Sequence, residues 1–216
     1  MYNFQYVNLK QLSSTKKELI QIIYSVQDDV RQYFTFQFYF AGSIEHNMVT
    51  YDVKSNIGFD FDVDLYVNDY ECRYSAEEIK TKIRLAFNKI ARRYGYDDAE
   101  DSTRVITIKV KDRQNSKILH SCDFAIVNDY MDDDGNERQE YIHFNKKQKS
   151  YSWQEQPQGF YLLDEKEEWI KECGYWQDVR DLYLYKKNHN NDSHKHSRSI
   201  YAETIHEICQ RYGYYN

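Results

Sequence analysis

The chain has 216 residues, a formal net charge of −6 and an isoelectric point near 5.7, so nonspecific binding of long nucleic acid through bulk positive charge is excluded. Hydrophobic residues make up 41% of the chain, with one proline and seven glycines, which excludes a disordered or low-complexity chain. The length suits one well-packed domain, or a domain with a helical appendage.

Cysteine usage and hydropathy indicate the compartment. The four cysteines are widely spaced without a CxxC pair, which favours neither a zinc knuckle nor a disulfide framework. The N-terminal segment lacks a secretion-signal pattern, and no apolar run approaches the length of a membrane span. We therefore expect a cytoplasmic protein with no membrane contact.

The first third of the chain predicts alternating helices and strands. Apolar residues at helical spacing follow the cap-like Ser13 and Ser14, and Phe36, Phe38 and Phe40 alternate along a strand. The expected elements are a helix at 14–33, a strand at 35–41, a short helix from about 43 and a strand at 59–67.

The middle of the chain predicts another helix and two hairpins. Ser75 and Glu78 form a capping-box pattern that opens a helix, and Gly95 closes it. Strands at 103–110 and 117–127 flank the polar turn at 112–116, which is typical of an antiparallel hairpin, and a second hairpin turns at 131–136.

The C-terminal part predicts helices. Asp164 and Glu167 suggest a second capping box, Gly174 ends that helix, another helix follows from Trp176, and a last one spans 199–212. The prediction is an α/β (α+β) fold with a mixed or antiparallel sheet and flanking helices over 1–150, followed by a small helical C-terminal region over 151–216. Its boundary falls within 145–163.

Three aspartates at every second position dominate the sequence FDFDVDLYV. A strand turns alternate side chains to opposite faces, so Asp60, Asp62 and Asp64 share one face, with about 7 Å between each aspartate and the next. Like charges held that closely repel unless a cation neutralises them, and carboxylate oxygens suit Mg²⁺ or Mn²⁺. The alternative is an exposed strand with its polar face in water.

Asp123 lies in the middle of the apolar segment KILHSCDFAIV. An unpaired carboxylate in a central strand costs several kcal/mol, so a positive group is expected to meet it. That group is either a metal ion or a buried arginine or lysine. Upstream, Gly42 and Ser43 break a strand where a helix can begin, an arrangement that turns backbone N–H groups and a hydroxyl toward a phosphate.

Together these residues resemble the signature of the DNA polymerase β-like nucleotidyltransferase superfamily: a strand ending in Gly-Ser, a strand carrying Asp-hydrophobic-Asp, and a third in-strand aspartate. The resemblance covers roughly residues 30–130. It implies a nucleotidyltransferase palm in which Asp62, Asp64 and Asp123 are the catalytic metal ligands. Asp60 with Asp62 is the alternative register. The gap between Gly-Ser and the aspartates is longer than the family usually has, which implies an inserted loop around 50–58.

The resemblance also implies an activity, namely transfer of an NMP from an NTP to an acceptor hydroxyl with release of pyrophosphate, assisted by two Mg²⁺ or Mn²⁺ ions. Gly42 and Ser43 would bind the β and γ phosphates, and Lys186, Lys187 and Arg198 are candidates for further phosphate contacts. The acceptor is open: a small molecule, a nucleotide, RNA or a protein. The alternative function is a catalytically silent nucleotidyltransferase fold that acts as a binding or regulatory module of the toxin–antitoxin or phage-defence type.

Lys146, Lys147 and Lys149 precede Tyr151 and Trp153, a pattern suited to a phosphate-bearing acceptor or a nucleobase. A run of surface lysines without a function explains the pattern equally well.

Overall fold

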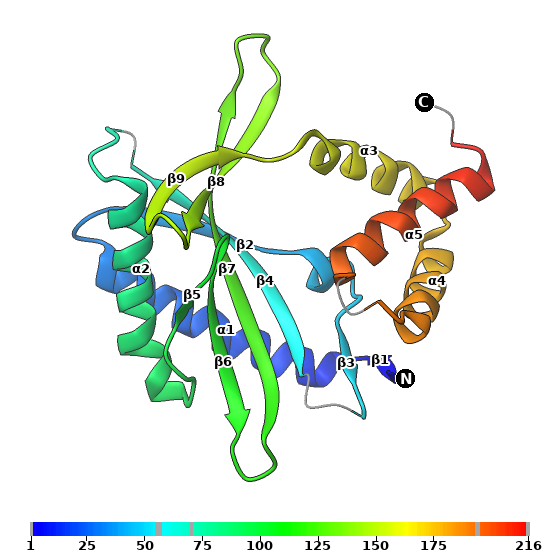
Figure 1. Cartoon of the computed structure of the whole chain (residues 1–216), viewed down its shortest axis with the longest axis horizontal. Helices are drawn as coiled ribbons and strands as arrows, with labels where there is room; N and C mark the ends of the chain where they lie inside the picture. The colour runs from blue at the N-terminus through cyan, green and yellow to red at the C-terminus, as the bar shows by residue number, and fades with distance from the viewer. Residues whose placement is uncertain (1, 55–57, 70, 193–194, 215–216) are drawn as a thin grey trace. The chain divides into compact units, whose positions relative to one another are not determined.

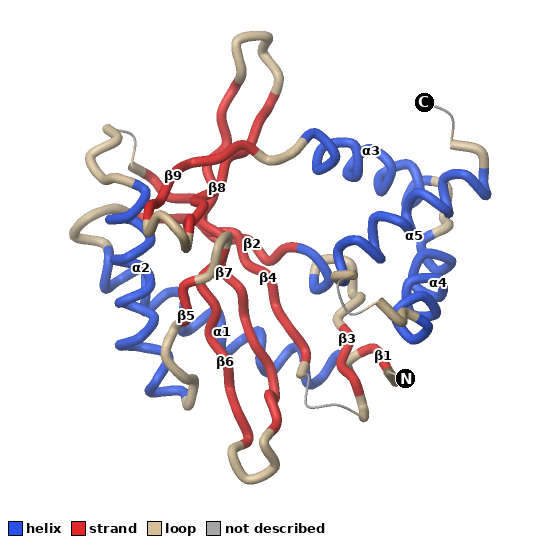
Figure 2. Tube along the Cα trace, in the orientation of Figure 1, coloured by secondary structure: helices blue, strands red, loops and turns tan. Residues whose placement is uncertain are grey.

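The computed structural model describes residues 2–54, 58–69, 71–192 and 195–214 (Figure 1). The chain divides into two compact units. The larger unit comprises residues 6–51 and 56–156, and the smaller comprises residues 1–5, 52–55 and 157–216. The long strands, red in Figure 2, belong to the larger unit, and the three C-terminal helices, blue in Figure 2, belong to the smaller unit.

The elements up to the middle of the chain are β1 (Phe4–Tyr6), α1 (Leu9–Val30), β2 (Thr35–Ala41), the 3-10 helix η1 (Gly42–Ile44), β3 (Thr50–Asp52), β4 (Phe59–Asn68), α2 (Ala76–Ala91) and the 3-10 helix η2 (Arg92–Tyr94). The remaining elements are β5 (Glu100–Asp101), β6 (Val105–Asp112), β7 (Lys117–Met131), β8 (Glu137–Asn145), β9 (Ser150–Glu155), α3 (Gln158–Glu172), α4 (Trp176–His189) and α5 (Ser197–Tyr212).

A mixed seven-stranded sheet organises the larger unit. Its main path runs β2-β4-β7-β6-β5, and β8 pairs with β7 and with β9. β4 is antiparallel to β2 and parallel to β7, while β7 is antiparallel to β6 and, in its last part, to β8. The mixed sheet with flanking helices confirms the predicted fold class. β1 and β3 form a separate two-stranded sheet.

One face of the sheet carries the hydrophobic core. Phe59, Phe61, Val63 and Leu65 of β4 are at most 3% exposed, and they pack with apolar residues of β6, β7, α1 and α2. Helices α1 and α2 therefore lie on this face. Since side chains alternate along β4, the aspartates between these residues point to the other face.

Most predicted elements of the larger unit are confirmed. β2 has the predicted bounds, β4 extends the predicted strand by one residue, and the capping box of Ser75 and Glu78 opens α2 with reciprocal hydrogen bonds. Both hairpins are present, although β7 continues to Met131. The third aspartate thus lies on a strand antiparallel to β6 but parallel to β4, which the hairpin alone does not reveal.

Two helix starts were placed too late in the sequence. The side chain of Asn8 accepts a hydrogen bond from the Lys10 amide and caps α1, so Ser13 and Ser14 lie inside the helix. Helix α3 begins after Pro157, seven residues before the predicted cap at Asp164. In both places the N-cap is an earlier residue with an extended backbone: Asn8 precedes α1 and Pro157 precedes α3. The short helix expected from about 43 is the three-residue 3-10 helix η1.

The insertion expected at 50–58 begins with β3, and residues 55–57 lie outside the described part of the chain. Residues 150–155 form β9 in the sheet of the larger unit. All four cysteines are free thiols; Cys122 and Cys209 are buried, whereas Cys72 and Cys173 are exposed.

In the smaller unit, α5 packs against both α3 and α4. The buried residues at these contacts include Ile170, Val179, Ile200, Ile205 and Ile208. No described helix is both long enough and apolar enough to cross a membrane.

Candidate metal and nucleotide site

Three aspartates meet on the sheet face opposite the core. One carboxylate oxygen each from Asp60, Asp62 and Asp123 lies within 4.8 Å of the other two. Asp62 of β4 stands directly beside Asp123 of β7 in the parallel register, which is why residues 61 positions apart come together. Two adjacent strands therefore supply a carboxylate-rich site.

Neighbouring hydroxyls hold two of these carboxylates. Ser121 Oγ donates a hydrogen bond to Asp60 Oδ1 over 2.8 Å, and Thr107 Oγ1 donates to Asp123 Oδ1. Each hydroxyl lies opposite its aspartate in the strand register. Among the described residues, neither Asp60 nor Asp123 forms an ion pair, so the buried arginine or lysine considered for Asp123 is not found.

The site is electrostatically strained without a cation. Burial, followed by the negative charges of Asp123 and Asp62, raises the pKa of Asp60 to about 7, against the opposing effect of the Ser121 hydrogen bond. Burial also raises the pKa of Asp123, while Thr107 and Lys109 act in the other direction. A divalent cation between the carboxylates would relieve both effects by favouring the ionised forms.

Gly42 lies directly against Asp62 of this cluster. Ala41 at the end of β2 pairs with Asp62, and the chain then turns at Gly42 with a φ of +64° into η1. A Cβ atom at Gly42 would stand 2.8 Å from Oδ2 of Asp62. Only glycine combines this backbone conformation with that close approach. Gly42 of the Gly-Ser turn predicted from the sequence thus lies directly against Asp62.

Asp64 lies outside the three-aspartate group. It stands between Tyr39 of β2 and Ala125 of β7 in the register, one side-chain position beyond Asp62 on the same face. Tyr66 lies further along the same strand. Its pKa is raised to about 12, mainly by burial and to a smaller extent by the negative charges of Asp129 and Asp64. The geometry brings together the carboxylates of the alternative register, Asp60 with Asp62.

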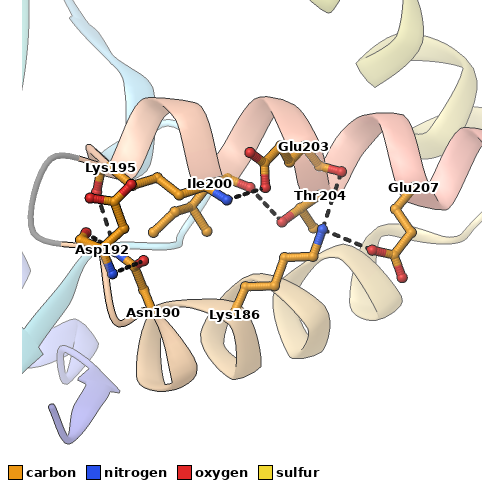
Figure 3. Close-up of polar contacts among 8 residues, drawn as sticks. All are labelled: Lys186, Asn190, Asp192, Lys195, Ile200, Glu203, Thr204 and Glu207. Carbon is orange, nitrogen blue, oxygen red and sulfur yellow. Dashed lines mark hydrogen bonds and ion pairs between the residues drawn. The ribbon is translucent and has the colours of Figure 1, made fainter. Parts of the chain in front are cut away.

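The three cationic candidates for phosphate contacts belong to the smaller unit and have partners there. Lys186 Nζ of α4 lies 2.8 Å from Glu207 Oε2 of α5 and donates to the Glu203 carbonyl (Figure 3). Lys187 is 9% exposed, with its Nζ 4.3 Å from the centroid of the Phe4 ring. The guanidinium of Arg198 lies over the Phe160 ring. Their binding of phosphates stays a prediction.

The aromatic residues after the lysine run are packed. The Tyr151 ring stacks on Phe144 with centroids 4.5 Å apart, and its hydroxyl donates to Asp101. Trp153 also packs against the hydrophobic core. These contacts favour a structural role for the two aromatic residues over a nucleobase platform.

Sequence reasoning missed Ser121 and Thr107. Ser121 lies two positions before Asp123, so the strand period already placed it on the same face. Its contact with Asp60 depends on the parallel pairing of β4 with β7, and the contact of Thr107 depends on the register of β6 with β7.

The residues present fit divalent metal ions. Three carboxylates form the hard-oxygen donor set that Mg²⁺ and Mn²⁺ prefer, and Gly42 lets the turn approach the carboxylate of Asp62 closely.

Solved structures share this fold, although no protein-family model and no curated protein matches the sequence. The cyclic dinucleotide synthase CdnE of Elizabethkingia meningoseptica, solved with GTP and Apcpp, superposes with a TM-score of 0.51 at 15% identity, over 88% of this chain and 67% of that one. The cyclic AMP-GMP synthase DncV of Vibrio cholerae, in complex with a linear intermediate, gives a TM-score of 0.55 at 15% identity, over 89% and 53%.

A third match is the STING-associated c-di-GMP synthase CdnE of Capnocytophaga granulosa, with a TM-score of 0.57 at 15% identity over 98% of this chain and 64% of that one. The chain thus corresponds to between about half and two thirds of the length of these proteins. The chain therefore has the nucleotidyltransferase fold of these neighbours.

Proposed function

We propose that this protein transfers an NMP from an NTP to an acceptor hydroxyl and releases pyrophosphate. The single observation that carries the proposal is the convergence of Asp60, Asp62 and Asp123 beside the glycine turn at Gly42. The fold supports it, because the chain shares this fold with solved structures described as cyclic dinucleotide synthases.

In this proposal Asp60, Asp62 and Asp123 hold the divalent cations, and the register is the one that places Asp60 with Asp62. Divalent cations, when bound, lower the pKa of an acceptor hydroxyl and neutralise charge on a leaving pyrophosphate. Ser121 and Thr107 orient two of the carboxylates, and Asp64 is a neighbour of the site rather than a metal ligand.

Gly42 and Ser43 bind the triphosphate of the NTP in this proposal. Without a side chain at Gly42, the backbone of the turn approaches the phosphates closely, and the hydroxyl of Ser43 donates to a phosphate oxygen. The acceptor oxygen attacks the α-phosphorus, the bond from that phosphorus to the bridging oxygen of the β-phosphate breaks, and the hydroxyl proton passes to solvent.

The acceptor that we propose is the hydroxyl of a second nucleotide, with a cyclic or linear dinucleotide as the product. This choice is supported by the solved neighbours that are described as cyclic dinucleotide synthases. It extends the coarser proposal, which holds for any acceptor hydroxyl.

The test is incubation of the full chain with each α-³²P-labelled NTP, alone and in pairs, with Mg²⁺ or Mn²⁺. Label that becomes resistant to phosphatase and depends on the metal supports transfer to a nucleotide. Label that appears only after addition of cell RNA or lysate keeps nucleotidyl transfer but changes the acceptor. If no NTP is consumed under any of these conditions, the catalytically silent alternative replaces the proposal.

A further inference from the structure

Two hydroxyl side chains stand beside the aspartate cluster in a repeating arrangement. β7 lies between β4 and β6, and on the site face it presents Ser121 to Asp60 on one side and receives Thr107 beside Asp123 on the other. In each pair, the residue with the hydroxyl lies directly opposite the aspartate on the neighbouring strand. The same interaction, a hydrogen bond from a hydroxyl on one strand to a carboxylate on the next, therefore occurs twice.

The two hydrogen-bond donors, Ser121 and Thr107, are neutral hydroxyls and not cations. A hydroxyl is neutral, so its hydrogen bond fixes the direction of a carboxylate without cancelling the negative charge that a cation needs. A lysine or arginine at the same place would neutralise the carboxylate and compete with the metal. Neither Asp60 nor Asp123 has an ion-pair partner among the described residues, and the hydroxyl in each pair binds Oδ1 alone.

We infer that Ser121 and Thr107 are positioning residues of the metal site, which hold Oδ1 of Asp60 and of Asp123 so that the remaining lone pairs of these carboxylates face the cation. This inference rests on the proposed function, because it takes the aspartates as metal ligands. Partners of this kind around metal ligands contribute about 10- to 100-fold in metal affinity.

A merely structural role is the competing explanation, in which the hydroxyls compensate for the burial of two carboxylates. That role affects the stability of the metal-free protein. A positioning role changes the affinity for the metal and the metal concentration at which activity is half-maximal.

The experiment measures Mn²⁺ binding to the full chain by the electron paramagnetic resonance signal of free Mn²⁺. Thr107→Val keeps the shape and removes the hydroxyl, whereas Thr107→Ser keeps the hydroxyl and removes the methyl group. Ser121→Ala removes the other donor, and Ser121→Cys replaces it with a weak donor of similar size. Ser152→Ala, at an exposed hydroxyl on β9 of the same sheet, is the control.

We expect Thr107→Val and Ser121→Ala to weaken Mn²⁺ binding about 10- to 100-fold, with Thr107→Ser and Ser152→Ala close to the parent and Ser121→Cys between Ser121→Ala and the parent. Urea unfolding in EDTA shows which variants remain folded, and Thr107→Ser and Ser121→Cys keep the test valid if a truncation unfolds.

Equal Mn²⁺ affinity in all variants would overturn the positioning role and leave the metal site intact. A loss in Thr107→Ser as large as that in Thr107→Val would also overturn it, because the methyl group and not the hydroxyl would then matter. A parent protein that binds no Mn²⁺ would overturn the metal site and the positioning role together.

Discussion

Gly42 and Asp62 are so close that a Cβ atom on the glycine would stand 2.8 Å from Oδ2 of the aspartate. The φ of +64° at Gly42 is a second reason why a residue with a side chain would be strained at this position. The turn and the carboxylate cluster therefore depend on each other, and a substitution in the turn is expected to act on the metal site.

Gly42→Val tests this relationship. The branched side chain must displace Asp62 or the turn, so we expect a loss of NTP transfer of more than about 100-fold, as a misplacement of about 1 Å commonly produces. Ser43→Ala removes one hydroxyl and should weaken NTP binding by about 1 to 2 kcal/mol. The transfer rate with labelled NTP measures the first loss, and titration with NTP and Mg²⁺, followed by the melting temperature, measures NTP binding in both variants. NTP binding equal to that of the parent in both variants would make Gly42-Ser43 an ordinary turn.

The register of the metal ligands is tested by four single substitutions. Asp60→Asn, Asp62→Asn and Asp123→Asn each remove a proposed ligand, and we expect each to lower the transfer rate by at least about 100-fold without unfolding the chain. Asp64→Asn is the matched control on the same strand face and should stay within about tenfold of the parent. If Asp64→Asn lowers the transfer rate as much as Asp62→Asn does, while Asp60→Asn stays active, the metal ligands are instead Asp62, Asp64 and Asp123.

The raised pKa of Asp60 predicts a pH dependence in EDTA. A carboxyl whose pKa rises from 3.8 to about 7 on folding contributes stability that is complete below pH 3.8 and is lost as the pH rises toward 7. His120, whose pKa burial lowers to about 4, has the opposite effect between pH 4 and 6.5. The difference between the parent and Asp60→Asn therefore isolates the aspartate.

We expect Asp60→Asn to melt at a higher temperature than the parent at pH 8 in EDTA, with a smaller difference at pH 5. Saturating Mg²⁺ should reverse the order, because only the intact cluster binds the ion in the folded state. Melting curves at both pH values, with and without Mg²⁺, measure this. A parent that is the more stable protein at pH 8 in EDTA would show that the cluster is not strained.

Gly58 predicts a packing requirement at the start of β4. A Cβ atom there would stand 2.3 Å from the Leu119 carbonyl oxygen and 2.5 Å from that of Ile118, both backbone atoms of β7. We expect Gly58→Ala to destabilise the chain by about 1 to 3 kcal/mol or more, as overpacking does. Gly159→Ala is the control, because an added Cβ would meet no heavy atom within 4 Å apart from its chain neighbours and the backbone of its own helix, α3. Urea unfolding should show the control unchanged or slightly stabilised, and a similar effect in both variants would contradict the prediction.

Sequence patterns located the elements that carry strong local signals. The alternation in β2 and β4 and the capping box of α2 depend on residues a few positions apart, so the sequence defines them without tertiary contacts. The starts of α1 and α3 were misplaced because several residues offered plausible caps, and only the backbone conformation distinguishes Asn8 from Ser13.

The sequence by itself determined that Asp60, Asp62 and Asp64 share one strand face and that Asp123 lies in a buried strand, because side-chain alternation is a local property of the backbone. It left open which pair of the three aspartates joins Asp123. The tertiary structure places Asp62 beside Asp123 in the parallel register of β4 and β7, and the side-chain positions then group the carboxylates of Asp60, Asp62 and Asp123. Strand register is set by packing between distant segments, so Ser121 and Thr107 became visible as partners of the site only in the folded chain.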